Sequence, residues 1–463
     1  MHGRGALLSA AAVSALILLV SYVSRDSGRA QTDNRDSQPS ALRLEIRRRH
    51  KELLPFYNNQ GDGAAGVVDN FARTFEHLDD WNIRALGASV ALLGCDDLRY
   101  ITLFESLGSG YTKAVLRGAL PNGAAIAIKS VNGQGIDMQR CLDDFGDSEG
   151  CYRLVSYKLI KEILLLQRLQ HPSMIRLKGH CYRREPDMRV MAVLELGSPL
   201  EMIPLLQTPW EERFRICISL VRLLHYLAHS PHGSVGLLDF QPRQFVLVDG
   251  ELKLTDIDDA TIEERMCSSE RDCILEFPTK NFSVSCDVTR RCQGLNEKRN
   301  LYNAFRYFFT YLLPHRSPSA FQSRLEKIMN QTGNLNIRIN ETLEAFEEIL
   351  YLYKSGQYLH KLVLSSLKDY SVHKGFRVKD DGGYRCWPSY DHQRCLLSVH
   401  NEAEAAEMCS SHKQCVGFTL TPQRTWTGRH LVSFHSDVDK LIPDVSFSVY
   451  VRKPVSSGPG LQR

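Results

Sequence analysis

The sequence predicts an α+β fold in two lobes, followed by a small cysteine-containing module. Between residue 99 and about residue 362, apolar side chains are dense and mix the period of strands with the period of helices. The chain has 463 residues, which suits roughly two or three compact units of ~100 to 250 residues each. A polar segment over residues 366–382 then predicts a boundary before a separate unit at residues 384–452.

The N-terminal region predicts that the chain enters the secretory pathway. Residues 1–24 combine a weakly basic start with an uncharged apolar stretch, which is typical of a secretory signal peptide. An uncleaved signal anchor is the alternative, because ~17 to 25 apolar residues can span a bilayer. Both interpretations place the remaining chain in the lumen or outside the cell. Residues 25–95 then predict a polar stem and an N-terminal helical extension, with a basic helix over residues 42–56.

The charge composition excludes several classes of protein. Lys and Arg number 57 against 53 Asp and Glu, so the formal net charge is only +4, and 43% of residues are hydrophobic. This balance excludes a disordered or collagen-like chain. No long run of one charge sign calls for nucleic acid or an anionic membrane. We therefore expect no nucleic-acid partner, and membrane contact only through the N-terminal signal if it is uncleaved.

Thirteen cysteines agree with an oxidising compartment. Their short gaps suit disulfide loops better than zinc knuckles, although the pairing stays open. Eight of them are close neighbours in sequence: Cys141 and Cys151, Cys267 and Cys273, Cys286 and Cys292, Cys409 and Cys415. Because thirteen is odd, at least one thiol is unpaired or intermolecular, and Cys217 in an apolar helical run is the candidate for a buried free one. The sequons at Asn281, Asn330 and Asn340 could accept glycans.

A loop with two glycines between extended stretches is the first candidate ligand site. Glycines at this spacing let backbone N–H groups approach phosphate oxygens, although a simple hairpin turn is the plainer interpretation. The expected nucleotide contacts are Leu107, Gly108, Ser109, Gly110, Tyr111 and Val115. Lys129 ends the next predicted strand, fourteen positions after Val115 (129 − 115). Its ammonium is a candidate for binding nucleotide phosphates, with a solvated edge charge as the alternative.

A phosphate-binding lysine needs a carboxylate that holds its ammonium in place. The apolar spacing over residues 156–169 predicts a helix, and Glu162 lies beside its apolar face. An ordinary surface glutamate is the alternative interpretation. The long separation of this pair, 162 − 129 = 33 positions, reflects an insert over residues 133–151, which we expect Cys141 and Cys151 to close into a loop.

Two aspartates bound a predicted hairpin whose turn is Asp249-Gly250. Asp239 precedes the first strand and Asp256 follows the second, seventeen positions later (256 − 239). Phosphoryl transfer needs one carboxylate to accept or orient the hydroxyl proton and another to hold the metal that bridges the phosphates. We therefore expect Asp239 to be the catalytic base and Asp256 to bind metal. Gln244 and Asp258 are the further metal candidates, although Asp258 is equally consistent with a solvated turn.

This ordered set resembles the protein kinase superfamily. The segments 237–244, 254–260 and 296–302 (LLDFQPRQ, LTDIDDA and NEKRNLY) are similar to the vertebrate lonesome kinase family of secreted tyrosine kinases. The resemblance begins near Cys95 and covers most of the chain. It implies a bilobal protein-kinase-like fold over residues 96–365, with a small β-rich N-lobe and a helical C-lobe.

The resemblance also implies a function. It implies ATP and Mg²⁺ or Mn²⁺ as cofactors, with Lys129, Glu162 and Asp239 as catalytic residues. The implied substrates are tyrosines of secretory-pathway, secreted and extracellular-matrix proteins. The implied location is the Golgi apparatus and the extracellular space, with roles in skeletal development. Only the resemblance predicts tyrosine rather than serine as the acceptor.

Several positions depart from the usual kinase pattern. Lys113 stands where the third glycine of the phosphate loop is expected, so the loop loses some backbone closeness and gains a cation. Leu237-Leu238 replaces the usual His-Arg, so we expect no control by activation-loop phosphorylation. Gln244 replaces an asparagine but keeps its amide oxygen. Phe277-Pro278-Thr279 replaces Ala-Pro-Glu, and we expect disulfides to fix this loop instead of an ion pair.

The sequence also predicts the nature of the C-terminal unit, and two alternative functions stay open. A predicted helix over residues 403–408, followed by Cys409, Cys415 and a strand, is similar to PAN/apple-type modules. Either the module docks substrate or matrix, or it is a disulfide-stapled lid on the C-lobe, which we favour. A secreted pseudokinase and a secretory-pathway serine or glycan kinase are the alternative functions. Having Lys129, Glu162, Asp239 and Asp256 together argues against the pseudokinase.

Overall fold

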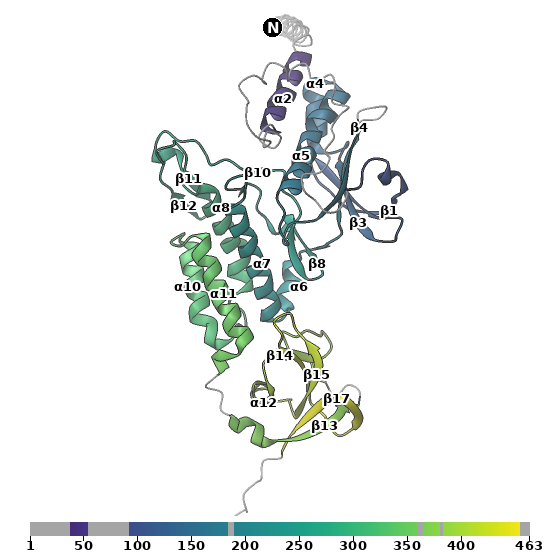
Figure 1. The fold of residues 1–463 in the computed structure, drawn as a ribbon, viewed down its shortest axis with the longest axis vertical. Coiled ribbons are helices and arrows are strands. Elements are labelled where there is room, and N and C mark those ends of the chain that lie inside the picture. The colour runs from purple at the N-terminus through teal and green to yellow at the C-terminus, as the bar shows by residue number, and fades with distance from the viewer. Residues whose placement is uncertain (1–37, 54–91, 184–188, 360–363, 380–382, 454–463) are drawn as a thin grey trace, which may run out of the picture. The chain divides into compact units, whose positions relative to one another are not determined.

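The computed structural model describes residues 38–53, 92–183, 189–359, 364–379 and 383–453. The chain divides into two compact units (Figure 1). The first comprises residues 1–170 and 175–196, and the second comprises residues 171–174 and 197–463. The predicted signal segment, residues 1–24, lies outside the described residues. No helix within the described ranges is long and apolar enough to cross a membrane.

The first unit is built on a five-stranded antiparallel sheet, as predicted for a β-rich N-lobe. The strand order is β1-β2-β3-β5-β4. The strands are β1 (Thr102–Ser109), β2 (Lys113–Ala119), β3 (Ala125–Val131), β4 (Leu177–Arg183) and β5 (Arg189–Glu195). Branched apolar side chains of β3 and β5, among them Ile126, Ile128 and Val193, form a small core at the sheet. The disulfide Cys95–Cys181 ties the segment before β1 to β4.

The described residues of the first unit also form three α-helices: α2 (Gln38–Leu53), α4 (Ile136–Phe145) and α5 (Ser148–Arg168). The helix predicted over residues 156–169 begins earlier, because the Asp147 side chain caps it by accepting a hydrogen bond from the Gly150 N–H at 3.0 Å. The insert between Lys129 and Glu162 is helical as α4, and the disulfide Cys141–Cys151 closes it as predicted. Helix α2 packs against α5, with Leu42 buried.

The second unit begins with a mainly helical region, as predicted for the C-lobe. Its helices are α6 (Met202–Gln207), α7 (Trp210–Ala228), α8 (Leu295–Ala304), α9 (Thr310–Leu312), α10 (Gln322–Gly333) and α11 (Ile339–Ser355), with a π-helical turn at Phe305–Phe309. Cys217 lies in α7, is fully buried and is free, as predicted. Burial raises the pKa of its thiol, so the group stays protonated and acts as a small apolar side chain.

Four short strands of the second unit carry the predicted hairpin and the loops on either side of it. They are β7 (Gly236–Leu237), β8 (Phe245–Val248), β9 (Glu251–Leu254) and β10 (Ala260–Thr261). Strands β8 and β9 form the hairpin, to which β6 (Ser198–Pro199) adds a third strand. Asp249 and Gly250 have φ angles of 52° and 77°, which is the left-handed backbone that a two-residue hairpin turn requires. The predicted turn is therefore confirmed.

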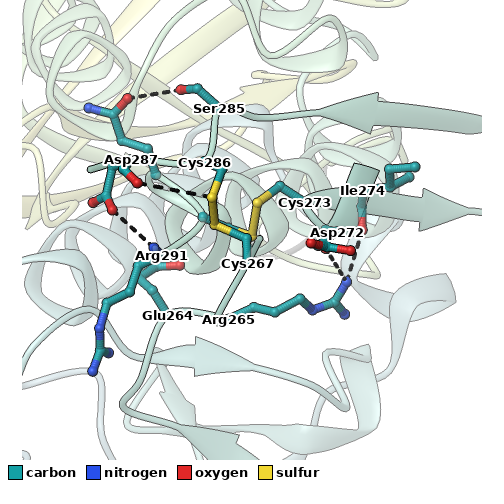
Figure 2. The surroundings of a disulfide bond; sticks show 12 residues. Glu264, Arg265, Cys267, Asp272, Cys273, Ile274, Ser285, Cys286, Asp287 and Arg291 are labelled. Atoms are coloured by element: carbon teal, nitrogen blue, oxygen red, sulfur yellow. Dashed lines mark hydrogen bonds between the residues drawn. A yellow bond between two sulfur atoms is a disulfide. The ribbon is translucent and has the colours of Figure 1, made fainter. Parts of the chain in front are cut away.

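Two disulfides hold the segment after β10, in which β11 (Ile274–Phe277) pairs with β12 (Lys280–Ser283). Cysteines that are neighbours in sequence do not pair here. Cys267 bonds Cys286, and Cys273 bonds Cys292. The bonds lie close together, since sulfur atoms of Cys267, Cys273 and Cys292 are all within 4.8 Å of one another. Figure 2 shows the surroundings, where the Arg265 guanidinium donates to the carbonyls of Asp272 and Ile274.

The C-terminal module is a five-stranded antiparallel sheet in the order β13-β17-β15-β16-β14. Its elements are β13 (Tyr370–Val378), β14 (Cys395–Val399), α12 (Glu402–Ser411), β15 (Gly417–Arg424), β16 (His430–His435) and β17 (Leu441–Arg452). Strand β13 lies within the polar segment that predicted a boundary, so the sheet begins before residue 384. It is an edge strand in which Tyr370 is buried and the remaining residues are partly or fully exposed, so polar side chains are tolerated there. Disulfides Cys386–Cys395 and Cys409–Cys415 staple the module.

A buried carboxylate joins this module to the helical region. Glu211, in the first turn of α7, is 1% exposed. It accepts hydrogen bonds from four hydroxyl groups: Ser398 at 2.6 Å, Tyr390 at 3.1 Å, Tyr353 at 3.3 Å, and Thr427. The positive end of the α7 dipole also favours an anion at this position. These contacts fit the interpretation that the module is a lid on the C-lobe.

Candidate active site

In the first unit, Glu162 turns inward from α5 and meets the predicted lysine. The Lys129 ammonium lies 2.6 Å from Glu162 Oε1, and the Glu162 side chain has no exposed surface. Lys129 lies in the buried part of β3, where residues 126–129 are all buried. Glu162 is therefore not a surface glutamate, and Lys129 is not a solvated edge charge. The structure brings the two predicted residues together.

A second lysine reaches the same carboxylate. Lys113, the first residue of β2, places its ammonium 2.7 Å from Glu162 Oε2. The sequence identified Lys113 only as the residue in place of the third glycine. Its approach to Glu162 depends on two positions 49 residues apart, so no local pattern could predict it.

The glycine loop forms the turn between β1 and β2, as predicted. The Gly110 N–H donates to the Lys113 carbonyl at 2.8 Å, which closes the turn. The predicted nucleotide contacts Leu107, Gly108, Ser109, Gly110 and Tyr111 are all exposed, whereas Val115 is half-buried opposite Lys129. A Cβ atom at Gly108 would meet nothing within 4 Å, so one face of the loop is open to a ligand.

Asn132 holds the glycine loop from the other side. Its side-chain amide donates to Ser109 Oγ at 2.9 Å and to the Gly110 carbonyl at 2.8 Å, and its backbone N–H donates to the Thr112 carbonyl. Asn132 was not among the predicted site residues. An asparagine just after a strand commonly makes such backbone hydrogen bonds, which is the signal that could have identified it.

In the second unit, three side chains that follow Asp239 donate to its carboxylate. Gln241 Nε2 lies 2.8 Å from Oδ1, Arg243 Nη2 lies 3.3 Å from Oδ2, and Gln244 also donates to Oδ2. The short helical turn Pro242–Gln244 places these donors. Together these hydrogen bonds fix the orientation of the carboxylate. Gln241 and Arg243 were missed as site residues, although their spacing of two and four positions from Asp239 was visible.

The Asp239 loop and the Asp256 loop lie side by side. Strand β7, just before Asp239, pairs with β10, just after Asp256, and the Thr255 N–H donates to the Gln244 carbonyl at 2.8 Å. Asn300 of α8 supports β7, because its side chain accepts from the Leu237 N–H at 2.9 Å and donates to the Val235 carbonyl at 2.8 Å. The segment 296–302 that suggested the family therefore positions the strand that leads into the Asp239 loop.

A pocket between these loops contains the predicted metal ligands. Its polar lining consists of oxygen-bearing side chains: Asp239, Gln244, Asp256, Asp258 and Asp259. Carboxylate and amide oxygens are the donors that Mg²⁺ and Mn²⁺ prefer, so the residues present fit such an ion. Asp258 is 9% exposed, which is unlike a solvated turn residue. Metal binding by Asp256, Gln244 and Asp258 stays a prediction.

The structure shows the burial and the contacts of the residues that depart from the kinase pattern. Leu237 is buried, and Leu238, which stands in place of the usual arginine, is 54% exposed. Phe277 ends β11, and Pro278-Thr279 forms the turn into β12. The Phe277 ring packs on Tyr302 of α8 at 4.2 Å between centroids, so apolar packing and two disulfides secure this segment.

The three predicted glycosylation sites all present exposed asparagines. Asn281 lies in β12, Asn330 in α10 and Asn340 in α11. The sequon threonines Thr332 and Thr342 are buried and donate to helix carbonyls. Glycosylation at these positions stays a prediction.

Comparisons with known proteins match this chain to protein kinases. The model of the protein-kinase domain of FAM69 matches residues 156–334. The chain is 53% identical over 362 residues to the human (Homo sapiens) extracellular tyrosine-protein kinase PKDCC, covering 78% of this chain and 73% of that protein. It is also 26% identical over 185 residues to cysteine-rich receptor-like protein kinase 44 of Arabidopsis thaliana, covering 38% and 43% of the two chains. The chain therefore belongs to the protein kinase superfamily and, within it, to the family of the extracellular tyrosine kinase PKDCC.

Proposed function

We propose that this protein phosphorylates tyrosines of secreted, Golgi-resident and extracellular-matrix proteins, with Asp239 as the catalytic base. Family membership makes it an ATP-dependent protein tyrosine kinase that uses a divalent metal. The similarity to an extracellular kinase and six disulfides among the described residues support a secreted enzyme. The substrates, the location in the Golgi and the role in skeletal development go beyond family membership and belong to our proposal.

The observation that carries this proposal is the set of donors around Asp239. A base for phosphoryl transfer must be ionised and must aim one oxygen at the acceptor hydroxyl. Gln241 binds Oδ1, while Arg243 and Gln244 bind Oδ2, so the carboxylate has a fixed orientation. It is also about one-third exposed, which leaves it accessible to a tyrosine hydroxyl.

The other residues have complementary roles in the proposal. Lys129, held by Glu162, binds the α and β phosphates of ATP, and the glycine loop covers them. Asp256, Gln244 and Asp258 would hold Mg²⁺ or Mn²⁺ through their oxygen atoms. When bound, such an ion neutralises charge on the phosphate oxygens during transfer. Asp239 accepts the proton of the tyrosine hydroxyl as the hydroxyl oxygen attacks the γ-phosphorus. The bond between the γ-phosphorus and the bridging oxygen breaks in this step, and ADP leaves.

The proposal is tested with the purified secreted protein, ATP and either Mg²⁺ or Mn²⁺, acting on a mixture of extracellular proteins. Mass spectrometry would compare phosphotyrosine with phosphoserine for the wild type and for Asp239→Asn. We expect phosphotyrosine to fall by about 10²- to 10⁴-fold in this variant. Asp249→Asn is the matched control, because Asp249 is an exposed turn residue in the neighbouring hairpin and asparagine tolerates its positive φ.

Three outcomes would contradict the proposal. Wild-type transfer by Asp239→Asn would remove the assigned base. Phosphoserine without phosphotyrosine would overturn the acceptor class while leaving the fold assignment intact. Binding of ATP without any transfer would indicate a pseudokinase.

A further inference from the structure

Glu162 binds two ammonium groups, whereas the family pattern that we described needs only one. Lys129 contacts Oε1 at 2.6 Å and Lys113 contacts Oε2 at 2.7 Å. In the register of β2 and β3, Lys113 lies opposite Val131 and Lys129 lies opposite Val115. Opposite residues share a face, so the two lysines are diagonal neighbours on one face of the sheet. One carboxylate therefore sets the position of both ammonium groups.

The charge of this cluster favours a polyanion. Two ammonium groups and one carboxylate carry one more positive charge than a single lysine–glutamate pair. All three side chains are buried, at 9%, 5% and 0% exposure for Lys113, Lys129 and Glu162. Charges in such surroundings interact more strongly than in water, so an additional anionic ligand would be bound favourably. A lysine ammonium on its flexible stem can also turn from one oxygen to another.

The position of Lys113 indicates which anion it would meet. It follows directly on the glycine loop, and the Gly110 N–H binds its carbonyl. Asn132 fixes the loop on one side, while the space beside Gly108 is open. The backbone of Lys113 is therefore held at the base of the loop that covers nucleotide phosphates in the proposed function.

We propose that Lys113 is a second phosphate-binding lysine, which shares Glu162 with Lys129 and contacts the phosphate oxygens of ATP. This inference rests on the proposed ATP-dependent function and adds a catalytic residue to it. Lys129 alone would then not account for recognition of the phosphates. A variant that lacks Lys129 would lose transfer but keep part of its preference for ATP over adenosine.

The test measures binding of ATP, ADP and adenosine to the purified full chain by calorimetry, without any need for turnover. In Lys113→Ala, we expect affinity for ATP and ADP to fall about tenfold or more, because a charge-assisted contact is lost. Affinity for adenosine should stay within about twofold, since adenosine has no phosphate. Lys113→Arg should keep most of the ATP affinity, and the double variant with Lys129→Ala should have a lower ratio of ATP to adenosine affinity than either single variant.

Arg117→Ala is the matched control. Arg117 lies on the same strand and also pairs with a glutamate, Glu105, but both side chains are about half exposed. We expect this variant to leave the ratio of ATP to adenosine affinity unchanged. A change in Lys113→Ala that equals the change in the control would show a general charge effect and overturn the assignment.

Failure of the inference and failure of the proposed function are distinguishable. If the wild type transfers phosphate and Lys113→Ala keeps the wild-type ratio of ATP to adenosine affinity, the Lys113 assignment is wrong and the kinase function stands. If the wild type transfers nothing but Lys113→Ala lowers that ratio, the function is wrong and the assignment stands. Equal loss of ATP and adenosine affinity would indicate a structural role for Lys113 and would also overturn the assignment.

Discussion

Glu162 and Glu211 are both enclosed carboxylates, one in each compact unit, but their partners differ in kind. Glu162 contacts two lysine ammonium groups. Glu211 contacts four hydroxyl groups from α11 and the C-terminal module. The hydroxyls are neutral, and they meet the hydrogen-bonding needs of the Glu211 carboxylate without adding charge. The lysines add positive charge beside Glu162, and this charge can attract an anionic ligand.

Burial of a carboxylate does not by itself identify a functional site. Both glutamates are at most 1% exposed. The chemical type of the partner separates them, because a hydroxyl network serves stability and an ammonium cluster can serve anion binding. Mutations at the two positions should therefore affect different properties, and four measurements can test this difference.

The largest effect is expected for Glu211→Ala. It would leave four donors without their acceptor at the base of the module, so the free energy of unfolding should fall by about 4 kcal/mol. Chemical denaturation of the secreted protein would measure this loss. Glu211→Gln keeps one acceptor oxygen and should lose less. A loss below about 1 kcal/mol in the alanine variant would mean that the network does not stabilise the junction.

The next effect is expected for Glu162→Gln, and it should appear in catalysis. Without its negative charge, residue 162 can no longer hold the ammonium groups of Lys113 and Lys129 in place. We therefore expect kcat/KM to fall about 100-fold, which corresponds to a loss of about 2.7 kcal/mol of transition-state stabilisation. Glu211→Gln is the counterpart, and its kcat/KM should stay within about threefold of the wild type. Equal losses in the two variants would remove the distinction between the sites.

The third prediction concerns how the stability of the protein depends on pH, through the buried imidazole of His435. Burial lowers the pKa of His435 from 6.5 to about 4, and its Nε2 lies 2.8 Å from the Thr419 hydroxyl. The unfolded chain therefore binds a proton at higher pH than the folded chain does. Stability should be complete above pH 6.5, fall as the pH drops from 6.5 to 4, and be lower by about 2 kcal/mol at pH 5.

Unfolding measured at pH 7 and pH 5 would check this expectation. His435→Gln cannot titrate, so its stability should change less than that of the wild type over the same interval. An equal pH dependence of the two proteins would assign the effect to other groups.

The smallest effect is expected for Tyr390→Phe. This change removes one of the four donors to Glu211 and should lower the free energy of unfolding by about 1.5 kcal/mol, the usual loss for a hydrogen bond to a charged group. Tyr351→Phe is the control, because the Tyr351 side chain is exposed. Equal stability of both variants would show that the remaining hydroxyls compensate fully.

Local patterns explain why much of the site could be predicted from the sequence. The glycine turn, the Asp249-Gly250 hairpin and the helix with Glu162 depend on residues close in the chain. Lys129 and Glu162 were paired through the chemistry that phosphate binding requires. The order of these elements then identified the fold, because few other folds need them in this sequence.

Other features depend on contacts that no local pattern encodes. Lys113 reaches Glu162 across 49 positions, and Asn300 supports the backbone at Leu237 across 63 positions. Helix α4 was missed because its two cysteines suggested only a closed loop. Strand β13 was missed because it is an edge strand whose apolar residues are interspersed with polar and charged ones, so its segment resembled a linker.

The connectivity of Cys267, Cys273, Cys286 and Cys292 has a consequence for how the protein is made. During synthesis, Cys267 and Cys273 emerge six residues apart before either native partner exists. Closing that short loop costs about 1 kcal/mol less chain entropy than closing one of the native 19-residue loops. The first partner that each thiol meets is therefore a non-native one, and wherever that bond forms, thiol–disulfide exchange must replace it. Production of the mature protein should accordingly follow the supply of disulfide isomerase in the producing cell.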